Sequence, residues 1–242
     1  MKPKAIILLL FLTGIIFTSC RTEETELIEA PEDEVLVANS TIASLIQRTT
    51  LNDGSKDNIV DKANCFNIKF PYEINVNGQE IILNSETDFA TVECVFDLSD
   101  DDTDTLDIIF PINIVLTDFS EITITNVTDF NSYNAGCSGE NVADNDIECI
   151  DFQYPIEAST FNSNSELLET LNLENDYQLY EFIEGIEEND IITLDFPISV
   201  TLADNTEMSI NNLNELQSII ENVINICDED DDYDYNEDDC DD

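Results

Sequence analysis

Four stretches of this sequence repeat one short pattern, in which an aromatic residue followed by proline lies inside an alternating run of apolar and polar residues. The stretches are CFNIKFPYEINV, LDIIFPINIVL, CIDFQYPIEAS and ITLDFPISVTL, and their prolines are Pro71, Pro111, Pro155 and Pro197. A pattern that returns every 40 to 44 residues indicates a supersecondary unit that is used several times. We therefore expect four related units, and this expectation constrains the fold more than any other feature of the chain.

Each stretch alternates in the way that a half-buried strand requires. In the first one, Phe66, Ile68 and Ile74 are apolar, while Asn67 and Glu73 on the other face are polar. Because side chains alternate across a strand, this pattern predicts one buried face and one solvated face. The proline falls on the outward face every time. Since proline donates no hydrogen bond to a ladder, it predicts a sheet edge or a bulge at that position.

Turn and helix signals follow the alternating strands. Asn77-Gly78 is a strong signal for a two-residue hairpin turn, and Ser85 with Asp88 resembles a helix capping box. Short second strands are predicted at 80–83, 121–124 and 207–210, and helices at 176–186 and 212–227. Each unit therefore reads as strand, strand, helix, although the second strand of the third unit has no clear place.

Two units form one domain in this interpretation, because cysteines double the period of the prolines. Cys65 and Cys149 each stand six residues before a proline, while Cys137 and Cys227 close the two pairs of units. We expect two tandem small α+β domains, each an antiparallel sheet with helices on one face. The predicted ranges are 61–138 for the first repeat domain, 139–147 for a linker and 148–227 for the second repeat domain.

The same symmetry predicts the disulfides of an exported chain. It favours Cys65–Cys137 and Cys149–Cys227, each of which would tie the first strand of a domain to its last helix. Cys94 and Cys240 have no equivalents in the other repeat. Six cysteines allow 15 pairings, so the connectivity stays open at this point.

The N-terminal residues have the composition of an export signal. Lys2 and Lys4 precede the apolar run AIILLLFLTGIIF, which is shorter than the ~20 residues that span a membrane. The small residues and the cysteine behind it resemble the lipobox of bacterial lipoproteins, with Phe17 and Ser19 where the family usually has leucine and glycine or alanine. The resemblance implies a signal peptide at 1–19 and a diacylglycerol on the sulfur of Cys20. The alternative is an ordinary secreted protein in which Cys20 is incidental.

An acidic string follows that cysteine at once. The residues RTEETE resemble the export signal of Bacteroidota surface lipoproteins, which implies an outer-membrane protein that faces outward from the cell. An anchor that faces the periplasm is the alternative. Residues 20–60 are polar and acidic without strong periodicity, so we expect them to form a lipidated tether, with room for one short helix, that links the membrane to the repeat domains.

Charge narrows the possible functions of the chain. Its net charge is −48, and from Phe70 to Asp242 it has 45 acidic residues and no Lys, Arg or His. Nucleic-acid binding relies chiefly on Lys and Arg, so we expect no nucleic-acid partner. Without histidine, the chain cannot build a Ser-His or Cys-His nucleophile. We therefore expect no enzyme, with a glycan hydrolase that uses two carboxylates as the less favoured alternative.

The acidic tail at 228–242 offers two interpretations. Asp230, Asp232, Asp234, Asp238 and Asp241 occupy positions 1, 3, 5, 9 and 12 of a loop, which resembles an EF-hand or thrombospondin type 3 calcium loop. Tyr235 stands where those families need glycine. The other interpretation is a solvated block of like charge. Calcium is therefore the one cofactor that the sequence suggests.

These observations predict the cellular location of the protein in more detail than its molecular activity. The expected function is that of a lipid-anchored surface lipoprotein with a non-catalytic binding or interaction module. Its partners would be the membrane, through the lipid, and an unknown protein or glycan. The alternative is a calcium-dependent adhesion or envelope protein in which cations bridge the acidic surface.

Overall fold

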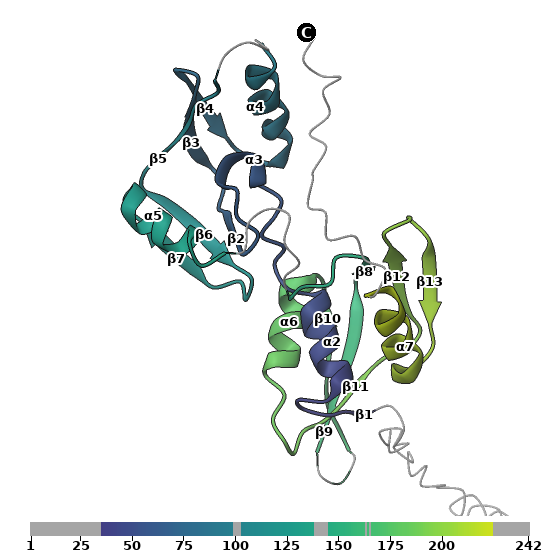
Figure 1. The fold of residues 1–242 in the computed structure, drawn as a ribbon. Coiled ribbons are helices and arrows are strands. Elements are labelled where there is room, and N and C mark those ends of the chain that lie inside the picture. The colour runs from purple at the N-terminus through teal and green to yellow at the C-terminus, as the bar shows by residue number, and fades with distance from the viewer. Residues whose placement is uncertain (1–34, 99–102, 138–144, 163, 165, 225–242) are drawn as a thin grey trace, which may run out of the picture.

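The computed structural model describes residues 35–98, 103–137, 145–162, 164 and 166–224. In this part of the chain, six α-helices and thirteen strands form small, open antiparallel sheets, so the predicted α+β class is confirmed. The elements form two halves that lie one above the other in Figure 1, and each half has its own hydrophobic core.

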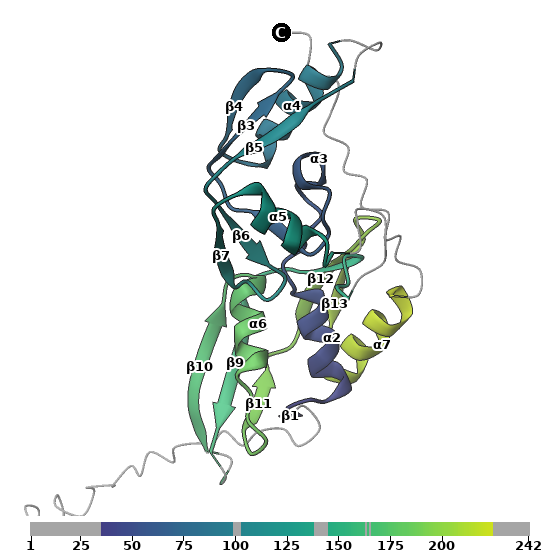
Figure 2. The same cartoon turned by 60° about the vertical axis from the view of Figure 1, so that its left-hand side comes forward.

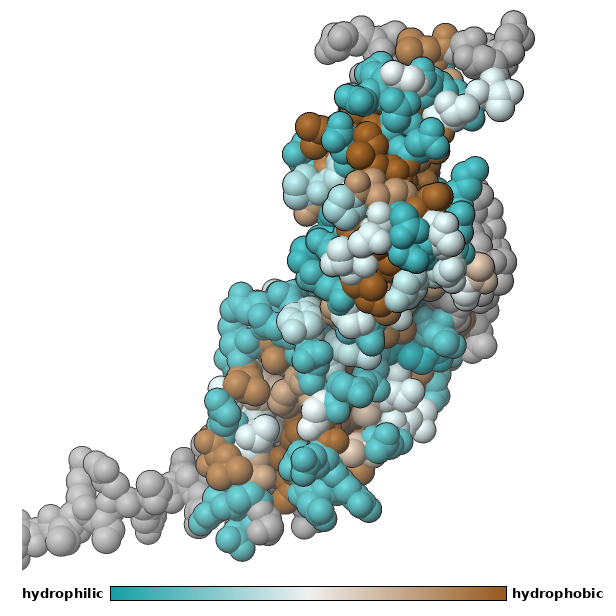
Figure 3. Space-filling view, turned by 90° about the vertical axis from the view of Figure 1, so that its left-hand side faces the viewer, coloured by the Kyte–Doolittle hydropathy of each residue, from teal (hydrophilic) through white to brown (hydrophobic). Residues whose placement is uncertain are grey.

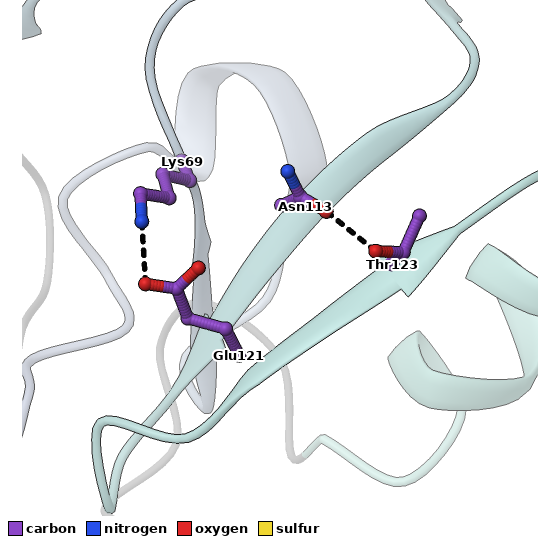
Figure 4. A network of polar contacts seen from close by, with 4 residues as sticks. All are labelled: Lys69, Asn113, Glu121 and Thr123. Atoms are coloured by element: carbon purple, nitrogen blue, oxygen red, sulfur yellow. Dashed lines mark hydrogen bonds and ion pairs between the residues drawn. The ribbon is translucent and has the colours of Figure 1, made fainter.

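The first half holds two three-stranded sheets, in the orders β2-β6-β7 and β4-β3-β5. Its strands are β2 (Phe66–Ile68), β3 (Tyr72–Val76), β4 (Gln79–Leu83), β5 (Leu106–Ile109), β6 (Ile112–Leu116) and β7 (Glu121–Ile124). Its helices are α3 (Asn58–Asp61), α4 (Phe89–Phe96) and α5 (Val127–Asn134). The sheet β2-β6-β7 has a polar outer surface, on which Lys69 forms an ion pair with Glu121 and Thr123 donates a hydrogen bond to Asn113 (Figure 4).

The second half repeats this plan with additions. Its sheets have the orders β13-β12-β8 and β1-β11-β9-β10. The strands are β1 (Val35–Leu36), β8 (Ile150–Phe152), β9 (Ile156–Phe161), β10 (Leu167–Leu173), β11 (Ile191–Leu194), β12 (Ile198–Leu202) and β13 (Glu207–Ile210). The helices are α2 (Thr41–Thr49), α6 (Asp176–Glu184) and α7 (Leu213–Val223). The strand that the sequence left unplaced in the third unit is β10, the longest of the set.

The alternating stretches are each two short strands, not one long strand. A cis peptide bond joins the aromatic residue to the proline in all four stretches, and the ladder is interrupted there. The strand before the proline joins the hairpin of the neighbouring unit: β2 pairs with β6, and β5 pairs with β3. In the second half, β8 pairs with β12 and β11 with β9 in the same way. The units of a pair therefore exchange their first strands.

The predicted buried faces are confirmed on both sides of these breaks. Phe66, Ile68, Ile74 and Val76 are buried in the core of the first half, while Lys69 on the opposite face is exposed. The alternation continues across each proline, which is why the two short strands read as one in the sequence. The period of two gives the buried face but does not say which sheet a strand joins.

Local signals placed most turns and helix starts correctly. Asn77 and Gly78 have φ angles of 51° and 85° and close the predicted two-residue hairpin between β3 and β4. Ser85 and Asp88 form the predicted capping box, which begins a short 3₁₀ helix that leads into α4. The helices α5, α6 and α7 begin after asparagines whose side chains accept backbone hydrogen bonds: Asn126, Asn175 and Asn212.

The predicted tether at 20–60 differs from the structure at its C-terminal end. Strand β1 pairs with β11, and helix α2 packs beside α6 and α7 in the second half (Figure 2). Leu36 and Ile46 are fully buried in that core. The reason is local: Ser40 caps α2, and Ile42, Leu45 and Ile46 give one face of this short helix an apolar stripe. The second half is thus built from two separate pieces of chain, with residues 58–137 inserted between them.

The cysteine predictions are confirmed for one pair. Cys65 at the start of β2 is bonded to Cys137 after α5, with 5.6 Å between their Cα atoms. Cys94 and Cys149 are also in disulfides. Because Cys227 and Cys240 lie outside the described residues, the Cys149–Cys227 bond stays a prediction.

The surface agrees with the acidic composition. On the face shown in Figure 3, hydrophilic side chains separate the hydrophobic patches from one another. In the described part of the chain, no helix has both the length and the apolar character that crossing a membrane requires. Cys20 and the lipobox-like residues around it fall outside the described residues.

Candidate metal centre between the two halves

The chain passes between the halves twice in the described region. The first crossing follows α2, and the second lies just before β8. Hydrogen bonds hold the two crossings together: Ile147 N donates to Arg48 O at 3.0 Å, and Arg48 Nε donates to Asn145 O at 2.6 Å. On the other side, Asn52 N donates to Thr117 O at 2.9 Å in the turn between β6 and β7. Hydrogen bonds therefore join backbone segments of both halves at this one place.

Three carboxylates meet at these crossings. One oxygen each of Asp53, Asp146 and Glu148 lies within 4.8 Å of the others. Asp146 is only 6% exposed, and the other two side chains are half-buried. Negative charges this close repel one another, and a cation between them removes the repulsion. Carboxylate oxygens are the ligands that Ca²⁺ and Mg²⁺ prefer, so this group can hold a metal ion.

The carboxylates line a cleft of about 620 Å³ that both halves contribute to. Five carboxylates and the single ammonium of Lys56 lie along it. Desolvation raises the pKa of Asp151, and the nearby Asp176 raises it further, while Lys56 opposes the shift. Asp176 also accepts a 2.6 Å hydrogen bond from the Tyr154 hydroxyl, whose pKa is raised by burial and by this carboxylate. The cleft is therefore strongly negative.

Two aromatic residues, Phe119 and Tyr177, also line the cleft. Phe119, in the β6–β7 turn of the first half, meets Tyr177 and Tyr180 of α6 with ring centroids 5.3 and 5.7 Å apart. Phe119 has a φ of 61°, a left-handed conformation that is unfavourable for a bulky residue. Tyr177 remains 49% exposed along the cleft. The ring of Phe119 is thus held against the other half in spite of local backbone strain.

This arrangement suits binding. A hard cation bound by the three oxygens that lie together would have coordination positions left for oxygens of a ligand, because Ca²⁺ takes six to eight oxygens. The exposed face of Tyr177 offers an apolar surface beside it. The volume of the cleft lies within the range of small-ligand sites, about 300–1,000 Å³.

The structure describes only three of the site residues predicted from the sequence. Cys65 and Cys137 are brought together, and Cys149 is buried in the core of the second half. The predicted lipidation and calcium residues, with the last predicted disulfide partner, lie outside the described residues: Cys20, Cys227, Asp230, Asp232, Asp234, Asp238 and Asp241. Of the predicted site residues, the three that the structure describes (Cys65, Cys137 and Cys149) do not line the cleft.

Sequence reasoning missed the carboxylates of the cleft. Asp146 and Glu148 fall in and just after the stretch assigned to a linker, where acidic residues are common. Asp53 opens DGSKDNIVDKAN, in which Asp53, Ser55, Asp57, Asp61 and Asn64 have the spacing 1, 3, 5, 9 and 12. That spacing was a usable signal, because calcium loops place their ligands at those positions. No pattern in the sequence predicts that Asp53 lies close to Asp146, because this contact depends on how the two halves pack together.

Comparison of the chain with models of protein families, with curated proteins and with solved structures finds no match. The function proposed below therefore rests on the residues of the chain and on the geometry of the cleft.

Proposed function

We propose that this protein is a non-catalytic binding module, anchored on the outer face of the outer membrane by a lipid on Cys20, which binds its ligand in the cleft between the halves. The observation that carries the binding site is the group of Asp53, Asp146 and Glu148 beside the ring of Tyr177. The lipobox-like N-terminus and the acidic string behind Cys20 support the location.

A glycan is the ligand class that this cleft suits best. Pairs of sugar hydroxyls are good ligands for a calcium ion that still has free coordination positions. Sugar rings also have apolar faces that pack on aromatic side chains such as Tyr177. An anionic ligand without a metal is disfavoured, because five carboxylates would repel it.

A calcium-dependent adhesion or envelope protein is the second candidate function, and one specific observation favours it. Asp53 belongs to the first crossing, while Asp146 and Glu148 belong to the second. A cation held by all three would connect the two halves directly. In that case calcium would stiffen the molecule for a mechanical task and would not position a ligand.

Calcium titration of the soluble fragment 21–242 tests the metal centre. We expect calcium to raise the melting temperature more than sodium does at equal ionic strength, because screening alone does not distinguish the two ions. Asp146→Asn should weaken calcium binding at this site, whereas Glu188→Gln, a matched change at an exposed turn, should not. Equal shifts from both ions would remove the metal centre from the proposal.

Retention on immobilised polysaccharides tests the ligand. We expect calcium-dependent retention that chelator abolishes and that Tyr177→Ala weakens. Retention that depends on neither calcium nor Tyr177 would place glycan binding outside the cleft. Calcium binding without retention on any polysaccharide would favour the adhesion or envelope function.

A further inference from the structure

Three polar side chains are buried together below the cleft, inside the first half. Asp57, Asn58 and Asp61 are 2%, 5% and 4% exposed. They come from α3 and the residue just before it, and they take no part in the cleft itself. Acidic and amide side chains are rarely buried this completely unless each has a partner.

The two carboxylates lie close to other carboxylates, which adds repulsion to the cost of burial. The charges that act on them are also negative: Asp57 acts on Asp61, and Asp53 acts on Asp57. Burial raises the pKa of both groups, and the neighbouring carboxylate raises that of Asp61 further. An arrangement of two buried acids without a cation is costly whenever both are ionised.

Two oxygens and one nitrogen in this group also lack hydrogen bonds. In the described structure, Asp61 Oδ2, Asn58 Oδ1 and Asn58 Nδ2 are buried with no hydrogen-bond partner. Native proteins have few such atoms, and an ion or water bound at the site is a common explanation. These atoms are therefore an observation separate from the charge, and they also indicate a ligand.

Asp61 is the common neighbour of the other two side chains in this short helix. Residues three and four apart on a helix are neighbours, which places Asn58 and Asp57 next to Asp61. Three of the four carboxylate oxygens already accept one hydrogen bond each, and each keeps a second lone pair that can face a cation. Asp57 accepts from Ile68 N at 2.7 Å and from Asn67 Nδ2 at 3.3 Å, and Asp61 Oδ1 accepts from Ala63 N at 3.0 Å. The remaining oxygens of Asn58 and Asp61 are left for a ligand.

The backbone around this group is firmly held. Asn134 Nδ2 donates to Asp61 O at 2.8 Å, and the Cys65–Cys137 bond joins the same two segments. Gly54 packs so closely that a Cβ atom there would lie 2.5 Å from Asn64 O and from Phe66 N. A preorganised set of oxygens binds a cation without the cost of ordering the chain.

We propose that Asp57, Asn58 and Asp61 form a second cation site, separate from the cleft, which takes a hard divalent cation such as Ca²⁺. The all-oxygen ligand set suits this class of ion. The calcium-loop spacing covers two of the three side chains: Asp57 and Asp61 stand at positions 5 and 9, while Asn58 stands at position 6, where such loops need glycine. Asp53, at position 1, has instead turned toward Asp146 and Glu148.

The number of calcium ions bound by fragment 21–242 and its variants tests this proposal. It is measured by calorimetry and by metal analysis after dialysis. Asp61→Asn keeps the shape of the side chain and removes the charge. We expect it to weaken one class of site by at least about tenfold and to leave the Asp146-dependent class unchanged. Asp107→Asn, at an exposed position of β5, is the matched control and should change neither class.

Thermal melts of the same variants add a readout that a purely structural role would not move. In chelator, Asp61→Asn should melt higher than the native protein because a buried charge is gone, and in calcium it should melt lower because a ligand is gone. Asn58→Ala, which also removes a ligand, should weaken the same class of site. Unchanged calcium binding in both variants would overturn the inner site, whatever Asp146→Asn does to the cleft.

Discussion

Two hairpin turns of this molecule have the same backbone and different side chains. The turn after β6 in the first half and the turn after β12 in the second half both place their third residue at a φ of 61°. In both, an aspartate side chain accepts a hydrogen bond from a backbone N–H two residues later: Asp118 from Ser120 and Asp204 from Thr206. The left-handed residue is Phe119 in one turn and Asn205 in the other.

The difference follows from what each turn faces. Asn205 is exposed, and asparagine tolerates the left-handed region well. Phe119 tolerates it poorly, but it packs against Tyr177 and Tyr180 across the cleft. The repeated unit thus determines the backbone of the turn, and the contact between halves determines the residue. A residue that departs from its repeat against local preference is a reason to propose a function at that surface.

The two halves also differ in how the chain builds them. The first half, residues 58–137, is continuous in the chain and is closed by Cys65–Cys137. The second half needs β1 and α2 from the other side of the first half. Each prediction below tests whether this contrast between a continuous and a divided half is real.

Deletion of residues 21–50 has the largest expected effect. It removes β1 and α2 with Leu36, Ile42, Leu45 and Ile46 from the second core, where two-state domains have only about 5–15 kcal/mol of stability in total. We expect the second half to unfold and the first half to stay folded. Hydrogen exchange resolved by peptide measures this. If the amide hydrogens of the second half stayed protected in the deletion variant, the second half would not need β1 and α2 to fold.

Removal of the Cys65–Cys137 bond comes next. The double change Cys65→Ala and Cys137→Ala should destabilise the first half by about 2–4 kcal/mol, because the bond closes a loop that spans both of its units. Urea unfolding followed by peptide-resolved exchange measures the loss in each half. If the second half lost as much stability as the first, the halves would unfold as one unit.

The response to pH should separate the halves in chelator. Burial raises the folded-state pKa of Asp57 and Asp61 above the unfolded value. At a pH between the unfolded and the folded pKa, the folded state therefore binds more protons than the unfolded state. Stability of the first half is therefore highest below the ordinary carboxyl range and falls as pH rises through the raised values. We expect the melting temperature of the first half to fall between pH 5 and pH 8. A rise over that range would mean that these acids are ionised and compensated.

Phe119→Asn has the smallest expected effect on stability. The change relieves about 1–2 kcal/mol of left-handed strain and removes aromatic contacts worth a similar amount, so net stability should move by less than about 1 kcal/mol. Glycan retention and the coupling between halves should weaken. Asn205→Asp, in the equivalent turn, is the control. An unchanged cleft function in Phe119→Asn would show that the departure from the repeat has no role there.

Local signals in the sequence were enough for the units but not for their assembly. The alternation through Phe66 and Ile74, the Asn77-Gly78 turn and the Ser85 cap each depend on a few neighbouring residues, and each was read correctly. The exchange of β2 and β5 was not predicted, because both possible sheets present the same apolar face to these strands.

The site escaped prediction for the same physical reason. Asp53 reaches Asp146 and Glu148 only because α2 docks on the second half, and no local pattern encodes that docking. The burial of Asp57 and Asp61 likewise depends on β2 and α5 closing over them. Only the loop spacing that these two acids share was visible in the chain before folding.

The divided second half has a consequence for the order in which the protein is made. Strand β1 and helix α2 leave the ribosome first, but their partners β11, α6 and α7 are among the last elements to be translated. The first half can complete itself in the meantime, whereas the apolar stripe of α2 has nothing to pack on. Until β11, α6 and α7 are made, α2 therefore lacks the partners against which its apolar stripe is buried in the folded protein.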